Sequence, residues 1–426
     1  MAKAVVTTAD AVVIGAGPAG AAAAYFLARA GHDVIALDKE TFPREKVCGD
    51  GLTPRAVKAM RMLGLHDEAD GRIPGWARQE GLRMHGGGVV VELGWPELDD
   101  WPSHSVTATR ALFDDTLARN AEKAGARLWE QTEVTGPVYR DATEARVAGV
   151  SYRRADGAEG VIRAPIVIVA DGGSSRFAVE LGLHRDERRP MGVAVRAYYR
   201  SPLSGSDMME GFLNLRAGGQ DSEGELLPGY GWIFPLDDGL VNVGWGLLNS
   251  SRHFRSTNYR RTLEDWITGL PAEWEISPST QVGRARSAGL PMGHSRRPHL
   301  HRGALLVGDA GGMINPFNGE GISYAIEAAA LAAEAADEAI RARSDAPLRR
   351  YPEALAREWG GYFTLGRAFV RVMGNPAVMR ACTVYGMPHP GLMRFVLRTM
   401  AHLTNRRSVD FTDRLLNALA RAVPAA

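Results

Sequence analysis

Cysteine is scarce in this sequence, and neither sign of charge is in excess. The 426 residues include two cysteines, Cys48 and Cys382, which lie far apart and cannot form a disulfide framework. The 50 basic residues almost balance the 49 acidic ones, so no overall field would hold nucleic acid. The cysteine spacing suggests no metal site. We therefore expect neither a metal nor nucleic acid as a partner.

Long uncharged apolar segments are also lacking. No run of about 18 apolar residues occurs, so a membrane-spanning helix is not expected. The first residues, MAKAVVTTADAVVIG, include a lysine and an aspartate where a signal peptide needs an uninterrupted apolar stretch. We expect a cytoplasmic protein whose membrane contact, if any, is peripheral on the inner face of the cell membrane.

The N-terminal segment DAVVIGAGPAGAAAAYFLARAGHDVIALDKE predicts a strand, a glycine turn, a helix and a second strand that ends at Asp38. In such a unit the first glycine permits the tight turn, the second lets a pyrophosphate approach and the third allows close helix packing. The free N–H groups at the helix start bind the anion. We assign these roles to Gly15, Gly17 and Gly20, with Asp38 on the ribose and Lys39 beside it.

Two later segments resemble the flavoprotein family typified by aromatic hydroxylases. GALLVGDAGGMINPFNGEGISYAIEAAALAAEAADEAI, residues 303–340, has the form of that family's late Gly-Asp motif, and VIVADGGSSR, residues 167–176, is similar to its middle Asp-Gly motif. The resemblance implies FAD as the cofactor. A helix start beside the flavin would also stabilise the negative charge of its reduced form. The implied FAD-binding residues are Arg110, Asp171, Gly172, Asp309, Gly321 and Ile322.

The order of these motifs predicts an α/β fold with a discontinuous, Rossmann-like FAD-binding domain of the aromatic-hydroxylase type. We assign to it residues 1–75, 106–180 and 281–345. An inserted antiparallel-sheet substrate domain would take residues 76–105 and 181–280, and residues 346–426 would form a helical C-terminal segment. MHGGGVVVELG, residues 84–94, continues as a strand rather than a helix and predicts a hairpin, so it is no second dinucleotide site. Electrons would come from a transient donor, NAD(P)H or a redox protein.

Two further segments narrow the resemblance to the geranylgeranyl reductase family. That family has a P-x-x-x-x-C-G segment and a Y-x-W-x-F-P strand, and FPREKVCGDGLTPRAVKAM and GYGWIFP match both. The likeness is greatest to the actinobacterial reductases that saturate one isoprene unit of menaquinone. It implies a polyprenyl substrate such as menaquinone and cofactor contacts by Cys48 and Gly49. The matching residues are Pro43, Cys48, Gly49, Tyr230, Trp232, Phe234 and Pro235.

The alternating rings at residues 230, 232 and 234 share one face of the predicted strand. They suit an ordinary hydrophobic core, and they also suit the wall of a tunnel for a prenyl chain, because each buried methylene contributes about 0.8 kcal/mol. An isolated alkene is a poor hydride acceptor, so its reduction requires a proton donor as well. Cys48 is the first candidate for this catalytic acid and Asp50 the second; a buried cysteine without a catalytic role is the alternative.

From Trp359 to Arg407 the sequence contains no aspartate or glutamate, but arginines alternate with aromatic residues and methionines. This composition indicates either a membrane-surface element or a helical cap over the substrate tunnel. GNPAV and GMPHPG should divide it into short helices. The arginines are Arg367, Arg371, Arg380, Arg394, Arg398, Arg406 and Arg407.

Two other functions are compatible with these motifs. Halogenases and monooxygenases share the fold, although Tyr230 and Phe234 differ from the outer residues of the halogenase W-x-W-x-I-P strand, which favours a reductase. Alternatively, the protein could be a non-catalytic flavin-bearing lipid carrier. A geranylgeranyl lipid or diphosphate is the alternative substrate within the reductase reading.

Overall fold

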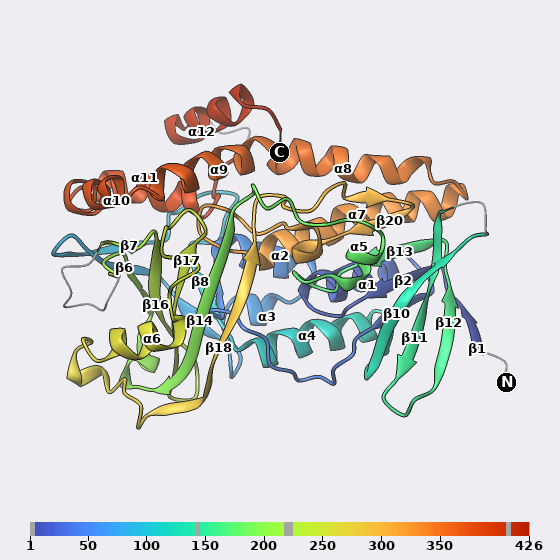
Figure 1. Cartoon of the computed structure of the whole chain (residues 1–426), viewed down its shortest axis with the longest axis horizontal. Helices are drawn as coiled ribbons and strands as arrows, with labels where there is room; N and C mark the ends of the chain where they lie inside the picture. The colour runs from blue at the N-terminus through green and yellow to red at the C-terminus, as the bar shows by residue number, and fades with distance from the viewer. Residues whose placement is uncertain (1–4, 142–144, 217–224, 406–409, 426) are drawn as a thin grey trace.

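The structure is a computed structural model, and it describes residues 5–141, 145–216, 225–405 and 410–425. Its central element is a six-stranded sheet with the order β19-β20-β13-β2-β3-β9, on the right of Figure 1. All neighbours are parallel except β19 and β20. The strands are β2 (Ala11–Ile14), β3 (Val34–Leu37), β9 (Arg127–Trp129), β13 (Ile166–Val169), β19 (Leu300–His301) and β20 (Ala304–Leu306).

Both faces of this sheet are covered, which explains why its central strands are continuous apolar runs rather than alternating patterns. On one face lie α1 (Pro18–Arg29), α4 (Arg110–Lys123) and α7 (Ile322–Ala342). The alanines of α1 and α7 are buried and let the two helices approach closely. A four-stranded sheet covers the other face: β1 (Val5–Thr8), β10 (Thr132–Tyr139), β11 (Val147–Arg154) and β12 (Glu159–Arg163).

A seven-stranded sheet with the order β18-β14-β17-β16-β15-β6-β7 forms the other half of the molecule. The predicted hairpin is present as its β6–β7 pair, and the predicted aromatic strand is β16. The sheet is antiparallel except for the parallel pair of β6 and β15. Its strands are β6 (Gly81–Gly86), β7 (Val89–Gly94), β14 (Met191–Arg200), β15 (Met208–Phe212), β16 (Gly229–Pro235), β17 (Leu240–Leu248) and β18 (Gln281–Pro291).

The predicted boundary at residue 281 is wrong for β18. This strand was assigned to the FAD-binding domain, but it pairs with β14 over most of its length at the edge of the seven-stranded sheet. Its mostly exposed residues show no apolar alternation, so the sequence had no signal that would place it there. The remaining domain division stays a prediction.

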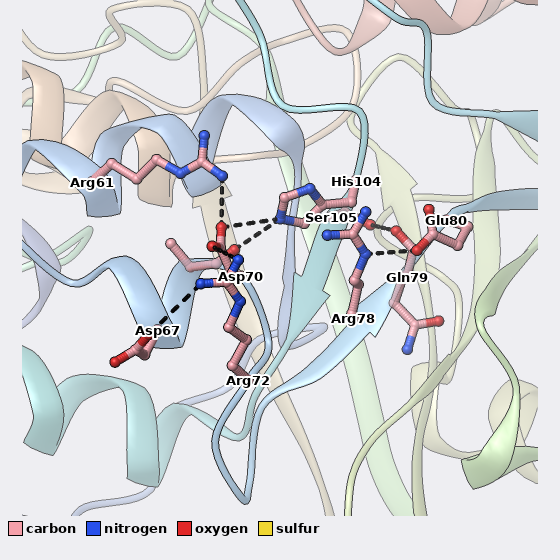
Figure 2. Close-up of polar contacts among 10 residues, drawn as sticks. Arg61, Asp67, Asp70, Arg72, Arg78, Gln79, Glu80, His104 and Ser105 are labelled. Atoms are coloured by element: carbon pink, nitrogen blue, oxygen red, sulfur yellow. Dashed lines mark hydrogen bonds and ion pairs between the residues drawn. The ribbon is translucent and has the colours of Figure 1, made fainter.

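A small three-stranded sheet joins the two halves and consists of β4 (Gly51–Leu52), β5 (Ala77–Gln79) and β8 (Ser105–Thr107). The short helices α2 (Pro54–Met62) and α3 (His66–Ala69) lie against it, and Figure 2 shows the polar contacts at this junction. Asp70 accepts a 2.6 Å hydrogen bond from Arg61. His104 lies 3.0 Å from the carbonyl oxygen of Ala69, and burial lowers the pKa of its imidazole, so the neutral ring makes this bond. The first contact holds the end of α3 against α2, and the second holds it beside the start of β8.

Short helices follow α7 along the top of the molecule in Figure 1. The breaks predicted at GNPAV and GMPHPG are present, since α9 ends at Met373 and α11 begins at Pro390. Among the described residues, no helix combines the length and apolar character needed to cross a bilayer. The helices that follow α7 are α8 (Arg350–Leu355), α9 (Gly361–Met373), α10 (Pro376–Ala381), α11 (Pro390–Met400) and α12 (Phe411–Ala422). Two other short helices precede it, α5 (Arg176–Glu180) and α6 (Tyr259–Ile267).

Candidate active site

The glycine turn between β2 and α1 has the shape that a bound pyrophosphate requires. A Cβ atom at Gly20 would lie 1.7 Å from the carbonyl oxygen of Gly15, so only glycine permits this close contact of helix and turn. Gly15 has a φ of +88°, in the left-handed region that favours glycine. Gly17 is the N-cap of α1, and no side chain caps the helix there. The first N–H groups of α1 therefore remain available to an anion.

Asp38 follows β3 directly and lies beside this turn. Its carboxylate accepts hydrogen bonds from the backbone N–H groups of Ala16 at 2.9 Å and Glu40 at 3.0 Å. Arg44 lies 3.6 Å from Asp38 and 3.2 Å from Asp114, and so links the predicted ribose residue to α4. The side chain of Lys39 is 64% exposed and lies 4.0 Å from Glu40. The structure therefore brings Asp38 to the turn but directs Lys39 toward solvent.

The segment of residues 45–50, named here the Cys48 loop, is held against the seven-stranded sheet at two points. At one end Arg196 of β14 contacts Glu45 at 3.0 Å and the carbonyl oxygen of Lys46 at 3.1 Å. At the other end the fully buried carboxylate of Asp50 accepts a 2.7 Å hydrogen bond from the Tyr198 hydroxyl. These contacts fix the loop between the two halves of the molecule.

Asn242 of β17 completes this attachment. Its amide nitrogen donates to the carbonyl oxygen of Cys48 at 2.9 Å and to Asp50 at 2.8 Å, and its amide oxygen accepts a 2.9 Å bond from the Trp232 indole. Burial raises the pKa of Asp50 to about 6, while the bonds from Tyr198 and Asn242 and the charge of Arg196 act in the opposite direction. Asp50 has a φ of +64°, a conformation that aspartate tolerates better than most residues.

Cys48 lies where the loop meets the FAD-binding half. Arg110, at the start of α4, lies beside its thiol and is held by two hydrogen bonds to Asp114, at 2.7 and 2.8 Å. Burial raises the pKa of the Cys48 thiol despite the opposing charge of Arg110. The side chain nevertheless retains some accessible surface, whereas Asp50 has none. The Cys48 thiol therefore has a raised pKa and lies beside Arg110 and the apolar core.

The two later motifs lie on the same side of the loop. Gly172 has a φ of +82°, and a Cβ atom there would lie 3.9 Å from the Lys46 ammonium group. Asp171 accepts a 3.2 Å hydrogen bond from the backbone N–H of Phe177 in the nearby helix α5. Its other carboxylate oxygen is buried without a hydrogen-bond partner among the described residues. Burial raises the pKa of Asp171, and bonds from Ser175 and the backbone oppose this shift.

Asp309 lies in the turn Gly308–Gly311, after β20, and its carboxylate is next to the start of α7. One of its oxygens is 3.3 Å from the position that a Cβ atom at Gly321 would occupy. Burial raises its pKa against the charges of Lys46 and Arg110. Ile322 begins α7, and no side chain caps that helix at Gly321, so a second uncapped helix start faces this region.

The aromatic face of β16 lies against the other side of the Cys48 loop. A Cβ atom at Gly49 would be 3.3 Å from the Phe234 ring and 3.4 Å from the Trp232 indole nitrogen, so the two rings lie close against the backbone of the loop here. Trp232 is 5% exposed, whereas Tyr230 and Phe234 are half-buried, and Pro235 is buried. Tyr230 donates a 2.9 Å hydrogen bond to the carbonyl oxygen of Asn318. The predicted common face is confirmed.

These residues fit the cofactor that the motifs imply. Two uncapped helix starts suit the two negatively charged parts of a reduced FAD, its pyrophosphate and its flavin. Asp171 has an oxygen without a hydrogen-bond partner among the described residues, and the glycine turn leaves space only for backbone.

Four residues at the site were not predicted from the sequence: Arg44, Tyr198, Arg196 and Asn242. The last three lie on ordinary strands, and only the fold brings them to the Cys48 loop. Arg176 of the middle motif points away, 87% exposed.

Comparison with known proteins identifies the class of protein to which this chain belongs. The family described as the FAD binding domain matches residues 8–358. The fold agrees with this match: a geranylgeranyl bacteriochlorophyll reductase-like protein from Thermoplasma acidophilum superimposes with a TM-score of 0.79 at 22% identity, covering 97% of this chain and 100% of that one. The predicted fold class and FAD cofactor are confirmed, and the protein is an FAD-dependent oxidoreductase.

The particular family follows from the sequence relatives. The chain is 37% identical to the menaquinone reductase of Mycobacterium tuberculosis over 96% of its length and 94% of that protein's. It is 30% identical to the digeranylgeranylglycerophospholipid reductase of Methanosarcina acetivorans, over 82% of this chain and 80% of that one. The chain belongs to the family of FAD-dependent reductases that includes these two proteins. The predicted resemblance is confirmed.

The turn at Gly17 provides a direct test of the cofactor site. In Gly17→Glu the new carboxylate would occupy the anion position at the start of α1, so the variant should purify without the yellow absorbance of bound FAD. Gly205→Glu adds the same side chain at a glycine with open space around it and should stay yellow. Absorbance spectra and thermal unfolding of both variants check this result. A yellow Gly17→Glu protein would contradict the placement of the pyrophosphate.

Proposed function

We propose that this protein saturates a carbon–carbon double bond in a polyprenyl chain, most specifically one isoprene unit of menaquinone. The relatives support this proposal, because two proteins that are similar over 96% and 82% of this chain are named a menaquinone reductase and a digeranylgeranylglycerophospholipid reductase. The observation that carries it is the contact of the aromatic face of β16 with Gly49. This contact puts apolar rings against the loop that carries Cys48, whose other side faces the FAD motifs.

The wall around this position is apolar on more than one side. Phe234 packs against an apolar cluster that contains Trp95 and Met209 from the seven-stranded sheet region and Ala401 and Leu403 from the C-terminal segment, with Leu397 beside it. A prenyl chain offers no polar groups, so it is held by burial of methylenes rather than by hydrogen bonds. The proposed pocket residues are therefore Tyr230 and Phe234, which keep accessible surface, with Trp232 supporting them from beneath.

Each group at the site has a distinct proposed role. Bound FAD, once reduced by a transient donor such as NAD(P)H or a redox protein, supplies the hydride for the alkene. Cys48 holds the proton that the other alkene carbon accepts, because burial raises the pKa of its thiol and it lies close enough to Tyr230 to affect the pKa of that ring. Asp50 is a positioning residue: its carboxylate is fully buried and holds the loop through Tyr198 and Asn242. The apolar rings exclude water from the developing positive charge.

The substrate is tested by mass spectrometry of menaquinone after anaerobic incubation with the purified, chemically reduced protein. We expect a gain of two hydrogen atoms in the tail after the quinone ring has been reoxidised. The Gly17→Glu protein, without FAD, is the matched control. If protein with reducible FAD adds no hydrogen to menaquinone but does so to a geranylgeranyl lipid, the menaquinone assignment fails and the prenyl reductase assignment stands. Rapid oxygen consumption with NADPH and no prenyl reduction would instead indicate a monooxygenase.

The proton donor is tested by the dependence of turnover on pH. Because the pKa of Cys48 is raised, its thiol stays protonated and turnover should remain constant up to at least about pH 8.5. Cys48→Ala should lower turnover by about 100-fold without loss of FAD, since a general acid contributes that much. Cys48→Ser restores a hydroxyl and should recover part of the rate. If turnover instead falls as pH rises through about 6, the acid is Asp50.

We also propose that the C-terminal segment contacts a membrane surface. Several large apolar side chains are exposed there: Tyr385 is 75% exposed, Phe411 76% and Leu392 47%. Among the arginines of this segment, Arg371, Arg380 and Arg394 are exposed, whereas Arg398 pairs with Asp413 at 2.7 Å and joins α11 to α12. Arg406 and Arg407 lie outside the described residues. Exposed rings next to arginines suit an anionic bilayer, from which a prenyl quinone could be drawn.

Flotation with phosphatidylglycerol vesicles tests this contact. The double variant Tyr385→Ser and Leu392→Ser should bind vesicles about tenfold more weakly than the unaltered protein, because less apolar surface enters the bilayer. A control with Val90→Ser and Val282→Ser changes exposed apolar residues of β7 and β18, outside the C-terminal segment. Equal binding by all three proteins would refute the membrane contact.

A further inference from the structure

Two adjoining cavities of about 360 and 270 Å³ lie between the segment of residues 184–189, the segment of residues 294–299 and the start of the C-terminal helices. His294 and Arg297 line both cavities. We name the larger one the cationic pocket. Besides these two residues, its lining consists of His184, Arg185, Asp186, Arg188, Arg189 and Ser295.

Positive charge in the cationic pocket is poorly balanced. Asp186 is its single carboxylate, and it is already engaged by Arg188, at 2.9 and 3.1 Å, and by Arg189 at 3.7 Å. In the part of the chain that the structure describes, no carboxylate contacts Arg185 or Arg297. Burial and the charge of Arg297 lower the pKa of Arg189.

Arg367 of α9 adds a further cation beside the pocket. Burial lowers its pKa to about 10, with further contributions from the charges of Arg189, Arg297 and Arg371. One of its guanidinium nitrogens is buried without a hydrogen-bond partner among the described residues, and another donates to the Thr364 hydroxyl at 2.8 Å. Arginines that lower one another's pKa in this way repel each other, and this cost is removed when an anion binds between them.

Buried polar atoms at the pocket also lack partners. His294 is 1% exposed, and neither of its ring nitrogens has a hydrogen-bond partner among the described residues. The Ser295 hydroxyl is also buried and has no hydrogen-bond partner among the described residues. Burial keeps the pKa of His294 well below its usual range, and the nearby His299, Arg297, Arg367 and Arg189 act in the same direction. A buried donor without a partner is costly, so it suggests a ligand group that completes it.

The wall of the pocket is the reverse side of the turn that carries Asp309. The backbone N–H of His294 donates to the carbonyl oxygen of Gly312 at 2.8 Å, and Arg296 donates to that of Ala310 at 2.7 Å. His299 lies 3.2 Å from the carbonyl oxygen of Gly311. The pocket is therefore separate from the candidate active site but shares one turn with it.

We propose that the cationic pocket binds the phosphate group of a phosphate-bearing ligand. Guanidinium groups match phosphate in geometry and charge, and the neutral donors Ser295 and His294 can complete its shell of hydrogen bonds. A phosphate or diphosphate carries more charge than a carboxylate and suits a site with several arginines and one acid. The phosphate could belong to a soluble ligand such as NADPH or to the headgroup of an anionic lipid. The inference does not depend on the proposed function.

Calorimetric titration of the FAD-loaded protein with pyrophosphate at low salt tests this site. Saturable binding is expected, with the dissociation constant raised about tenfold in Arg297→Ala and in Arg189→Ala. Arg260→Ala removes an exposed arginine from α6, remote from the pocket, and should bind like the unaltered protein. Flavin absorbance and thermal unfolding establish that each variant is folded. No saturable binding, or equal affinity in all four proteins, would overturn the proposal.

Competition identifies the source of the phosphate. If NADPH displaces pyrophosphate and phosphatidylglycerol vesicles do not, the pocket takes a soluble dinucleotide. If the vesicles displace pyrophosphate and NADPH does not, it takes a lipid headgroup. Displacement by neither assigns the pocket to a small free phosphate or diphosphate. Each of these results requires that the loss of affinity in Arg297→Ala has been observed first.

Discussion

The buried carboxylate of Asp50 is the interaction on which the arrangement of the site depends. It is bonded by Tyr198 of β14 and Asn242 of β17, and Asn242 extends the network to the Cys48 carbonyl and the Trp232 indole. A buried carboxylate is costly even when it is hydrogen-bonded, which is consistent with a pKa raised to about 6. The Asp50 carboxylate and the residues bonded to it hold the Cys48 loop, β16, β14 and β17 in fixed positions relative to one another.

This network joins two sheets that present different kinds of surface to the site. The six-stranded sheet and its helices present backbone N–H groups and glycine turns, which bind a charged dinucleotide. The seven-stranded sheet presents aromatic rings, which suit an apolar chain. The Cys48 loop lies between them and contacts both. The C-terminal helices close the far side, where Tyr362 and Asn315 bond the carbonyl oxygens of Thr399 and Met400.

Much of this architecture could be predicted from local sequence patterns. The glycine turn, the Asp309 turn and the alternating rings of β16 each depend on residues that are close in sequence. The edge strand β18 could not be predicted, because it is mostly exposed and has no apolar alternation. Tyr198 and Asn242 also carried no signal: each is an ordinary strand residue, and only the pairing of Tyr198 with Asn242 across β14 and β17 brings them both to Asp50.

The arginines of the C-terminal segment look alike in the sequence, but they lie in different environments in the structure. The structure divides them by their partners. Arg398 pairs with Asp413 of α12, Arg367 lies beside the cationic pocket, and Arg371, Arg380 and Arg394 are exposed. Composition could indicate that the segment is basic, but the three different environments are determined by tertiary packing.

The central claim is that Asp50 and Tyr198 act as one unit that holds the Cys48 loop. A double-mutant cycle of unfolding free energies measures this coupling directly, using Asp50→Gly, which suits the left-handed backbone, and Tyr198→Phe. We predict that the double variant loses at least about 1 kcal/mol less than the sum of the single losses, because either single change already removes the hydrogen bond between the two groups. Losses that add within about 0.3 kcal/mol would contradict the account.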